Sequence, residues 1–310
     1  MISHSSPLRF CLPAAVAAVL TFGPAPQARA QAQDPDSELA PIAVHHTIQH
    51  SAHNGAGRPK SGAGISYHGG PVMGTSSAVN VYVIWYGNWT GNSATTIIPS
   101  FLGAIGGSPY FNINTTYYNG SGVHVANAVT YSGATTDNYS QGTALSDGQI
   151  QTVVSSAISS GRLPTDANGV YFVLTSADVT ASSGFCTVYC GWHTVGTING
   201  THIKYSFVGN PDRCPSACEA QSASSPNDNP GADGMVSIIA HELEEATTDP
   251  ELNAWYDSRG AENADKCAWT FGTTLKASNG SAYNMTLGGN NYLIQRNWVN
   301  SGSGYCALIY

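Results

Sequence analysis

Charged side chains are scarce in this sequence, and basic ones are especially few. Asp, Glu, Lys and Arg make up 10% of the 310 residues, whereas an average soluble protein has roughly 25%. Lys and Arg together number 11, against 19 Asp and Glu. Binding to nucleic acid or to an anionic membrane surface depends on a surplus of basic residues. We therefore expect neither as a partner of this protein.

Several common catalytic motifs are also missing. The sequence has no GxSxG nucleophile turn, no phosphate-binding glycine loop and no dinucleotide-binding fingerprint. It therefore gives no support to a serine hydrolase of that type or to a nucleotide-dependent enzyme. Glycoside hydrolysis by a pair of carboxylates remains an alternative, because the separation of two acids in space is not visible in a sequence.

No apolar run approaches the ~20 residues that a membrane-spanning helix needs. A shorter apolar stretch, residues 10–22, follows Arg9 and precedes Ala28-Arg29-Ala30, which fits a small-x-small cleavage site. We interpret residues 1–30 as a secretory signal peptide with cleavage near Gln31. Cleavage removes the two basic residues of the signal peptide, Arg9 and Arg29. Nine basic and 19 acidic residues remain, so the net charge becomes −10.

The cysteine count supports an extracellular protein. One of the seven cysteines, Cys11, lies in the signal peptide. An even number in an exported chain indicates three disulfides, with fifteen pairings open to the sequence. Two C-x3-C pairs could bind zinc instead, but an oxidising compartment favours disulfides. The six remaining cysteines are Cys186, Cys190, Cys214, Cys218, Cys267 and Cys306. We expect Cys267 to pair with Cys306, and the other four to staple the loops before residue 240.

The domain organisation follows from where periodic patterns begin. Residues 31–66 are polar and aperiodic, which predicts a disordered leader or pro-segment, and residues 67–310 form one domain. Strands and helices alternate in it, so the predicted class is α/β, with α+β as the alternative. The predicted strands are 79–86, 169–179 and 202–210; the predicted helices are 94–107 and 146–161; the predicted loops are 184–194 and 214–233.

The stretch AHELEEATTDP, residues 240–250, differs by one residue from a zinc-protease helix. That signature is HExxH, in which two histidines one turn apart bind zinc and the glutamate is the general base. Here Glu245 stands where the second histidine belongs. Asp233 can cap a helix that begins at Gly234 or Met235. On that helix Glu244 faces away from the apolar side, so we expect it in solvent and assign it no role.

The other polar residues of this helix form one stripe beside its apolar face, namely His241, Glu242, Glu245 and Asp249. Like charges at i,i+3 and i,i+4 cost about 0.2–0.5 kcal/mol each. No Lys or Arg occurs between Arg213 and Arg259 to relieve them. Such an acidic arrangement in a charge-poor protein predicts a bound divalent cation.

We expect His241 and Glu245 to bind this ion and Glu242 to act as general base for a water. The third ligand is Glu262 or Asp265 from the segment that follows, and the sequence does not choose between them. Asp249 can join only if the helix bends. A further candidate, His193, is more simply read as a histidine packed in a disulfide loop. Zinc is the expected ion, and oxygen ligands also admit manganese or calcium.

The ordered motifs of the domain resemble those of the phosphate-induced protein 1 family, which includes the plant EXORDIUM proteins. The motifs that carry the resemblance are YHGGPVMG, VNVYVIWYGNW, LSDGQIQ, VYFVLTSADV, GFCTVYCGWH, YSFVGNPDRCPSAC, GADGMVSIIAHELEEATTDP and GYCALIY. The resemblance implies an extracellular, often wall-associated protein with no established biochemical activity.

Two functions are therefore expected for this chain. The first is a secreted, metal-dependent, metallopeptidase-like hydrolase on a zincin-like mixed-sheet scaffold, acting on extracellular protein or peptide. The alternative is a non-catalytic extracellular protein, binding cell-wall material or signalling, with a structural ion or none.

Overall fold

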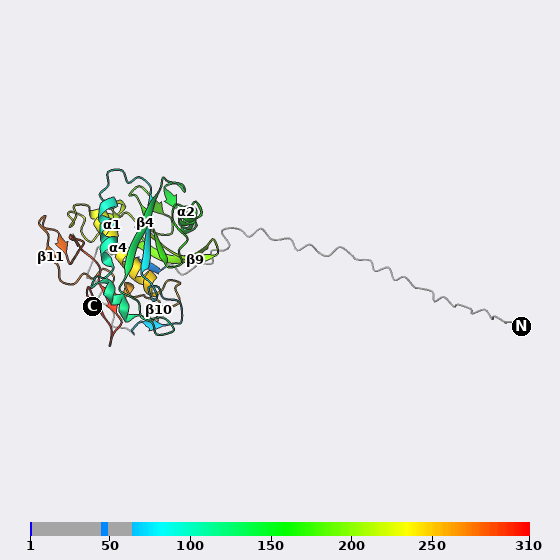
Figure 1. Ribbon diagram of the computed structural model, residues 1–310. Helices are drawn as coiled ribbons and strands as arrows, with labels where there is room; N and C mark the ends of the chain where they lie inside the picture. The colour runs from blue at the N-terminus through cyan, green and yellow to red at the C-terminus, as the bar shows by residue number, and fades with distance from the viewer. Residues whose placement is uncertain (2–44, 49–63) are drawn as a thin grey trace. The chain divides into compact units, whose positions relative to one another are not determined.

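The computed structural model describes Met1, residues 45–48 and residues 64–310 (Figure 1). The predicted signal peptide and most of the predicted leader lie outside the described residues. By its internal contacts the chain divides into Met1–Glu38 and Leu39–Tyr310. The elements below belong to the second unit. The domain boundaries proposed above stay a prediction.

A six-stranded mixed sheet forms the centre of this unit. Its strand order is β1-β8-β9-β6-β3-β4. The strands are β1 His45–Ile48, β3 Val79–Tyr86, β4 Val129–Asp137, β6 Gly169–Thr175, β8 Tyr189–Ile198 and β9 Thr201–Gly209. Strands β4, β3, β6 and β9 are parallel neighbours, whereas β8 runs antiparallel to both β9 and β1. The prediction of an α/β domain with a mixed sheet is confirmed.

Helices cover both faces of this sheet. Helix α1 Ala94–Ile105 packs against α4 Pro230–Thr248 on one side, and α2 Asp147–Ser159 lies on the other (Figure 1). The side chains of β6 are all buried, as parallel strands covered on both faces require. A capping box begins α2, in which the side chains of Ser146 and Gln149 each accept from the other residue's backbone N–H.

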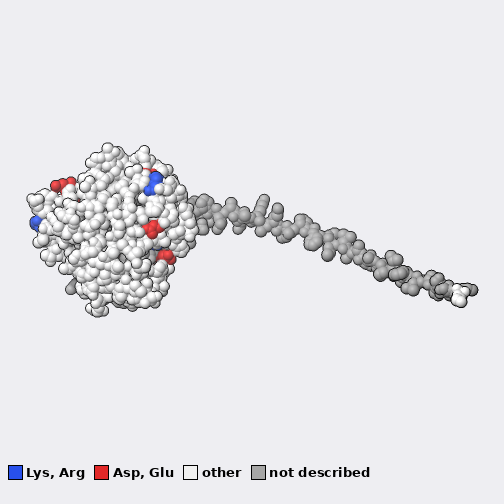
Figure 2. All heavy atoms as spheres, in the orientation of Figure 1, with Lys and Arg blue, Asp and Glu red and all other residues white. Residues whose placement is uncertain are grey.

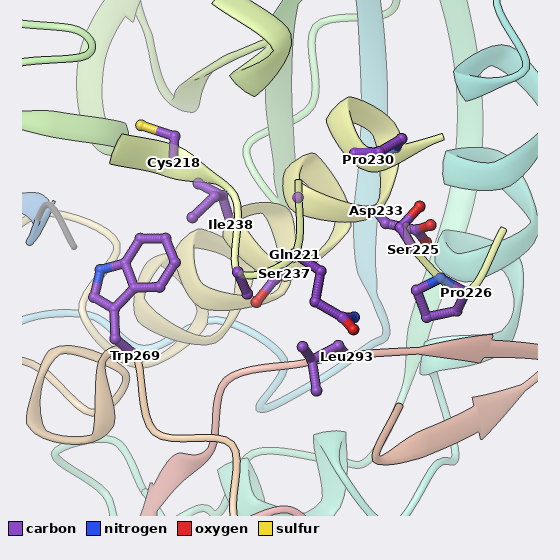
Figure 3. Close-up of a pocket in the computed structure, with 12 residues that line it drawn as sticks. Cys218, Gln221, Ser225, Pro226, Pro230, Asp233, Ser237, Ile238, Trp269 and Leu293 are labelled. Atoms are coloured by element: carbon purple, nitrogen blue, oxygen red, sulfur yellow. The ribbon is translucent and has the colours of Figure 1, made fainter. Parts of the chain in front are cut away.

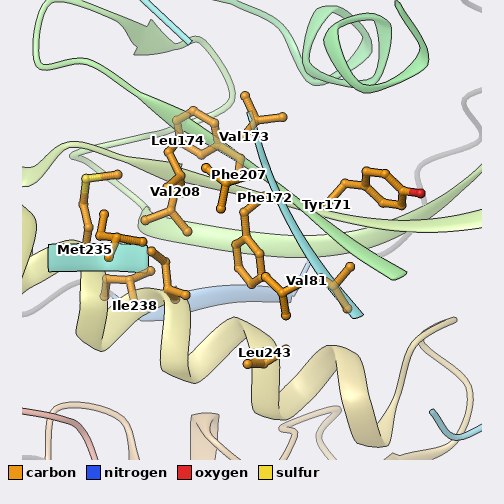
Figure 4. Close-up of a cluster of buried hydrophobic side chains, with 14 of the residues drawn as sticks. Val81, Tyr171, Phe172, Val173, Leu174, Phe207, Val208, Met235, Ile238 and Leu243 are labelled. Atoms are coloured by element: carbon orange, nitrogen blue, oxygen red, sulfur yellow. The ribbon is translucent and has the colours of Figure 1, made fainter. Parts of the chain in front are cut away.

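Helix α4 packs its apolar face against the sheet. Figure 4 shows Met235, Ile238 and Leu243 of the helix together with Phe172 and Val208 of the sheet. All five are at most 1% exposed. Burying each such side chain contributes about 1.5–3 kcal/mol. This packing holds the polar residues of α4 in a fixed place relative to β8 and β9.

The remaining elements are short. A one-turn helix α3 spans Pro215–Cys218. Five two-stranded pairs complete the fold: β2 Ser66–Tyr67 with β10 Trp255–Tyr256, β5 Ala144–Leu145 with β7 Thr180–Ala181, β11 Leu275–Lys276 with β12 Ala282–Tyr283, β13 Met285–Leu287 with β14 Asn290–Tyr292, and β15 Asn297–Val299 with β16 Tyr305–Ala307. Three 3-10 turns lie at Phe111–Thr116, Pro211–Arg213 and Asp265–Cys267.

All six cysteines of the domain are paired. The disulfides are Cys186–Cys214, Cys190–Cys218 and Cys267–Cys306. The first two join the start of β8 to the segment before α4, and the third ties the loop after α4 to β16. The predicted Cys267–Cys306 bond is confirmed, as is the stapling role of the other four cysteines. Three disulfides agree with an extracellular location.

Three sequence predictions differ from the structure. The loop predicted over 184–194 is mostly strand β8, because β9 provides an antiparallel partner. Helix α4 begins four to five residues earlier than predicted. Its cap is Asn229, which accepts from the N–H of Ala232 at 3.0 Å, and Pro230 at the first position fixes a helical φ. The segment expected to be a leader contributes the four-residue strand β1, which is too short to show a period.

None of the described helices has the length and apolar character that a membrane crossing requires.

Candidate metal centre

Three parts of the chain bring imidazoles and carboxylates together. Helix α4 contributes His241, Glu242 and Glu245, and strand β8 contributes His193. These four side chains are 0% exposed. The loop after α4 adds Glu262 and Asp265. The face of the domain visible in Figure 2 carries few charged side chains, whereas the acids of this cluster are gathered in the interior.

The first group of possible ligands is His241, Glu245 and Asp265. His241 Nε2 lies 3.0 Å from Glu245 Oε1 and 3.5 Å from Asp265 Oδ1. The backbone N–H of Asp265 donates to Glu245 Oε1 at 2.9 Å, which holds the loop against the helix. Asp265 is the partly exposed member, with 10% of its side chain accessible. Of the two acids predicted for the third position, Asp265 is the one that meets His241.

The second group is His193, Glu242 and Glu245. His193 Nδ1 lies 3.4 Å from Glu242 Oε2 and 3.6 Å from Glu245 Oε2. Its other nitrogen, Nε2, lies 3.4 Å from the backbone oxygen of Asp249 and 3.7 Å from Glu262 Oε1. Glu262 therefore meets His193 rather than His241.

The geometry of both groups fits a coordinated cation. With ligand bonds of about 2.1 Å, two ligands of a tetrahedral zinc are about 3.4 Å apart. The nitrogen–oxygen distances in the two groups span 3.0 to 3.6 Å. His241 Nε2, His193 Nδ1 and Glu245 Oε2 are buried without a hydrogen bond of good geometry among the described residues. Buried polar atoms of this kind require an explanation, and an ion between them supplies one.

The ionisation of the cluster reflects its negative charge. Burial lowers the pKa of His193 and His241, but their carboxylate neighbours outweigh it and raise both values well above 6.5. Burial opposes the ionisation of Glu245, yet the two histidines lower its pKa far below the ordinary value. Burial raises the pKa of Glu242 and, more strongly, that of Glu262. The carboxylates of the cluster thus favour positive charge on both imidazoles.

Asp249 has a structural position at the end of α4. It is the C-cap residue, and its Oδ1 accepts from the N–H groups of Asn253 and Ala254, both at 2.6 Å. The helix therefore does not bend to bring this carboxylate to His241, and neither group of possible ligands includes it. Its backbone oxygen contributes instead, as the neighbour of His193 Nε2.

The prediction that Glu244 faces solvent is wrong. Glu244 is 0% exposed, and its carboxylate accepts from the side-chain amide of Asn297. The prediction assumed that the side of the helix opposite its apolar face lies in solvent. In the structure, β15 and the loop at Asn263 cover this side of α4. Burial raises the pKa of Glu244 well above its ordinary value, against the opposing effect of the amides of Asn297 and Asn114.

A small pocket lies beside the first half of α4. Figure 3 shows Cys218, Gln221, Asp233, Ser237 and Trp269 around it. None of the cluster residues lines it. Ser237 precedes His241 by four residues, about 6 Å along the helix axis, so the pocket lies one turn from the cluster on the same helix.

His193 is the residue whose importance the sequence reading underestimated. It lies on strand β8, not in a disulfide loop, and it contacts three acids of the cluster. The signal that could have found it is Asn199-Gly200, since this dipeptide favours a two-residue hairpin between two strands. Asn199 and Gly200 have φ of 51° and 76° and link β8 to β9.

The chain is similar to a group of plant proteins. Residues 65–307 match the model of the phosphate-induced protein 1 conserved region. The chain is 34% identical to Protein EXORDIUM-like 5 of Arabidopsis thaliana over 274 residues, covering 76% of this chain and 75% of that protein. It is 33% identical to Protein EXORDIUM-like 3 of the same plant over 281 residues, covering 78% and 82%. Protein PHOSPHATE-INDUCED 1 of Nicotiana tabacum is 27% identical over 227 residues, covering 62% and 67%. No solved structure matches the chain.

Proposed function

The chain belongs to the phosphate-induced protein 1 family, and we propose that it is a secreted, metal-dependent hydrolase of the metallopeptidase-like kind. Its substrate is extracellular protein or peptide. The observation that carries this proposal is the meeting of His241, Glu245 and Asp265 around one point. One imidazole and two carboxylates suit zinc, and they also admit manganese. A zincin-like scaffold, with the His-Glu helix packed under a mixed sheet, is part of the proposal.

The ion would make a water a better nucleophile and polarise the bond to be cleaved. Glu242 stands next to His241 in the sequence and faces the same cluster from α4. In this role its carboxylate accepts the proton of the attacking water. His193 Nδ1, 3.4 Å from Glu242 Oε2, orients that carboxylate. Asp265 is the partly exposed side chain of its group, so solvent and substrate approach from the loop after α4.

Hydrolysis of labelled casein by the secreted mature protein tests this function. We expect cleavage that EDTA abolishes and that added Zn²⁺ restores. Glu242→Gln should reduce the rate about 10²–10⁴-fold, the usual contribution of a general base. The control is Glu251→Gln, because Glu251 pairs with the exposed His202 and belongs to neither group of possible ligands. Cleavage that persists both with EDTA and in Glu242→Gln would show that the hydrolysis does not use this site.

A specific observation also supports the alternative of a non-catalytic protein with a structural ion. His193, His241, Glu242 and Glu245 are fully enclosed, and structural metal sites are closed, whereas catalytic ones keep an open position. In that case EDTA lowers the melting temperature, but no variant or metal produces hydrolysis. Cell-wall material is then the expected binding partner, which a pull-down with isolated wall polysaccharide would test.

A further inference from the structure

We propose that Glu245 bridges two divalent ions, one held with His241 and Asp265 and the other with His193 and Glu242. This inference rests on the metal site proposed above and adds a second ion to it. It also changes the role of Glu242 from general base to metal ligand. The two groups of possible ligands share a single residue, Glu245, which makes this residue the centre of the arrangement.

The two oxygens of Glu245 face different histidines. Oε1 lies 3.0 Å from His241 Nε2, and Oε2 lies 3.6 Å from His193 Nδ1. A carboxylate that used both oxygens on one ion would direct both toward the same ligands. Here each oxygen belongs to its own set of neighbours, which is the arrangement of a bridging carboxylate. Paired ions in hydrolytic sites lie about 3.5–4 Å apart, a separation that one carboxylate spans.

The surroundings of His193 are those of a metal ligand. A ligating histidine usually donates its second N–H to a backbone carbonyl or a carboxylate, which fixes the tautomer and aims the other nitrogen. His193 Nε2 lies 3.4 Å from the backbone oxygen of Asp249 and 3.7 Å from Glu262 Oε1. Its Nδ1 is therefore left to face Glu242 and Glu245. This nitrogen is fully buried and makes no hydrogen bond among the described residues.

The charge of the cluster also matches two ions. Glu242, Glu245, Glu262 and Asp265 carry four negative charges when ionised, and two divalent ions balance them. The second ion would lie between α4 and β8, the two elements that carry Glu242 and His193.

Metal stoichiometry tests the inference on the folded wild-type protein. The secreted protein is stripped with chelator, loaded with Zn²⁺, freed of excess ion and measured by elemental analysis. We expect two zinc ions per chain. Loading with Mn²⁺ should give the exchange-coupled electron paramagnetic resonance signal of a close pair rather than the six-line signal of an isolated ion.

Three variants assign the ions to their ligands. His193→Ala and His241→Ala should each reduce the zinc content from two ions to one, and His202→Ala should leave it at two. His202 is the matched control because it is a surface histidine, with 61% of its side chain exposed. Circular dichroism checks that each variant is folded. If His193→Ala does not fold, the Mn²⁺ signal of the wild type decides.

The outcomes separate the two proposals. One zinc per chain, unchanged in His193→Ala and lost in His241→Ala, would overturn the second ion and leave the first site intact. One zinc with an isolated Mn²⁺ signal has the same meaning. A wild-type protein that retains no zinc or manganese would overturn both.

Discussion

Gly191 of β8 packs so closely against Ile238 of α4 that only a glycine fits between strand and helix at this point. A Cβ added at position 191 would come 2.5 Å from Ile238 Cγ2 and 3.2 Å from Glu242 Oε1. Position 191 also lies two residues before His193 on the same strand. The absence of a side chain there sets the distance between the two elements that carry the candidate ligands.

Gly191→Ala should therefore destabilise the protein and displace Glu242. The added methyl group forces α4 away from the sheet, and overpacking of this kind costs about 1–3 kcal/mol. Urea unfolding measures the loss. Gly103→Ala is the control, because Gly103 lies inside α1 and a Cβ there meets no atom within 4 Å. That change should raise the free energy of unfolding by up to about 1 kcal/mol. Equal effects at both positions would contradict the close packing at Gly191.

Removal of the ion should lower the melting temperature of the wild-type protein. A ligand that binds the folded state alone, at a hundredfold excess over Kd, contributes about 2.7 kcal/mol. EDTA takes this contribution away. Glu245→Gln should blunt the response, because Glu245 belongs to both groups of possible ligands. Differential scanning calorimetry with and without EDTA checks both. Identical melting of the wild type under the two conditions, with a small gain in stability from Glu245→Gln, would mean that the acidic stripe binds no ion.

Loss of the Cys267–Cys306 disulfide should be strongly destabilising. This bond closes a loop with a sequence separation of 39 residues, for which chain entropy predicts about 3–4 kcal/mol. It also anchors the segment that begins at Asp265. The double variant Cys267→Ala/Cys306→Ala should show the loss in urea unfolding and a reduced metal content. A folded variant with full metal content would indicate that Asp265 keeps its place without the bond.

Glu219 should make stability depend on pH in a region away from the cluster. Burial and the neighbouring Asp212 raise the pKa of Glu219 from 4.5 to about 7. Because the folded state holds this proton more tightly than the unfolded state, the stabilisation is complete below pH 4.5 and is lost as the pH rises through 7. Each pKa unit corresponds to about 1.4 kcal/mol.

Urea unfolding at pH 5 and pH 8 tests this assignment. The wild type should lose about 1–3 kcal/mol relative to Glu219→Gln over this interval. Asp212→Asn should reduce the loss, because it removes the neighbouring charge. A wild type and a Glu219→Gln variant with parallel pH profiles would contradict the raised pKa.

Local patterns were enough to predict most of the central sheet and its helices. The β-branched run of β3 and the i, i+3, i+4 spacing in α2 each identify an element without knowledge of its neighbours. The same holds for His241, Glu242 and Glu245, since their spacing places them on one side of any helix.

The errors arose where a residue's environment depends on distant parts of the chain. Strand β8 was predicted as a loop because of its cysteines, while its pairing with β9 and β1 is not visible locally. Glu244 was placed in solvent because the cover over it comes from Asn297, 53 residues away. His193 joins the acids of α4 through packing of strand against helix, which no spacing in the sequence encodes.

Strand β1 occupies the edge of the sheet that β8 would otherwise present to solvent. His45 pairs opposite His193 in the antiparallel register. The N–H and C=O groups of an edge strand are a template for any extended chain, whatever its side chains. A peptide that pairs with β8 beside the candidate ligands must therefore displace residues 45–48. Because this segment is tethered to the domain, its effective concentration at the edge is high. Strand β1 therefore competes with any such peptide for pairing with β8, the strand that carries His193.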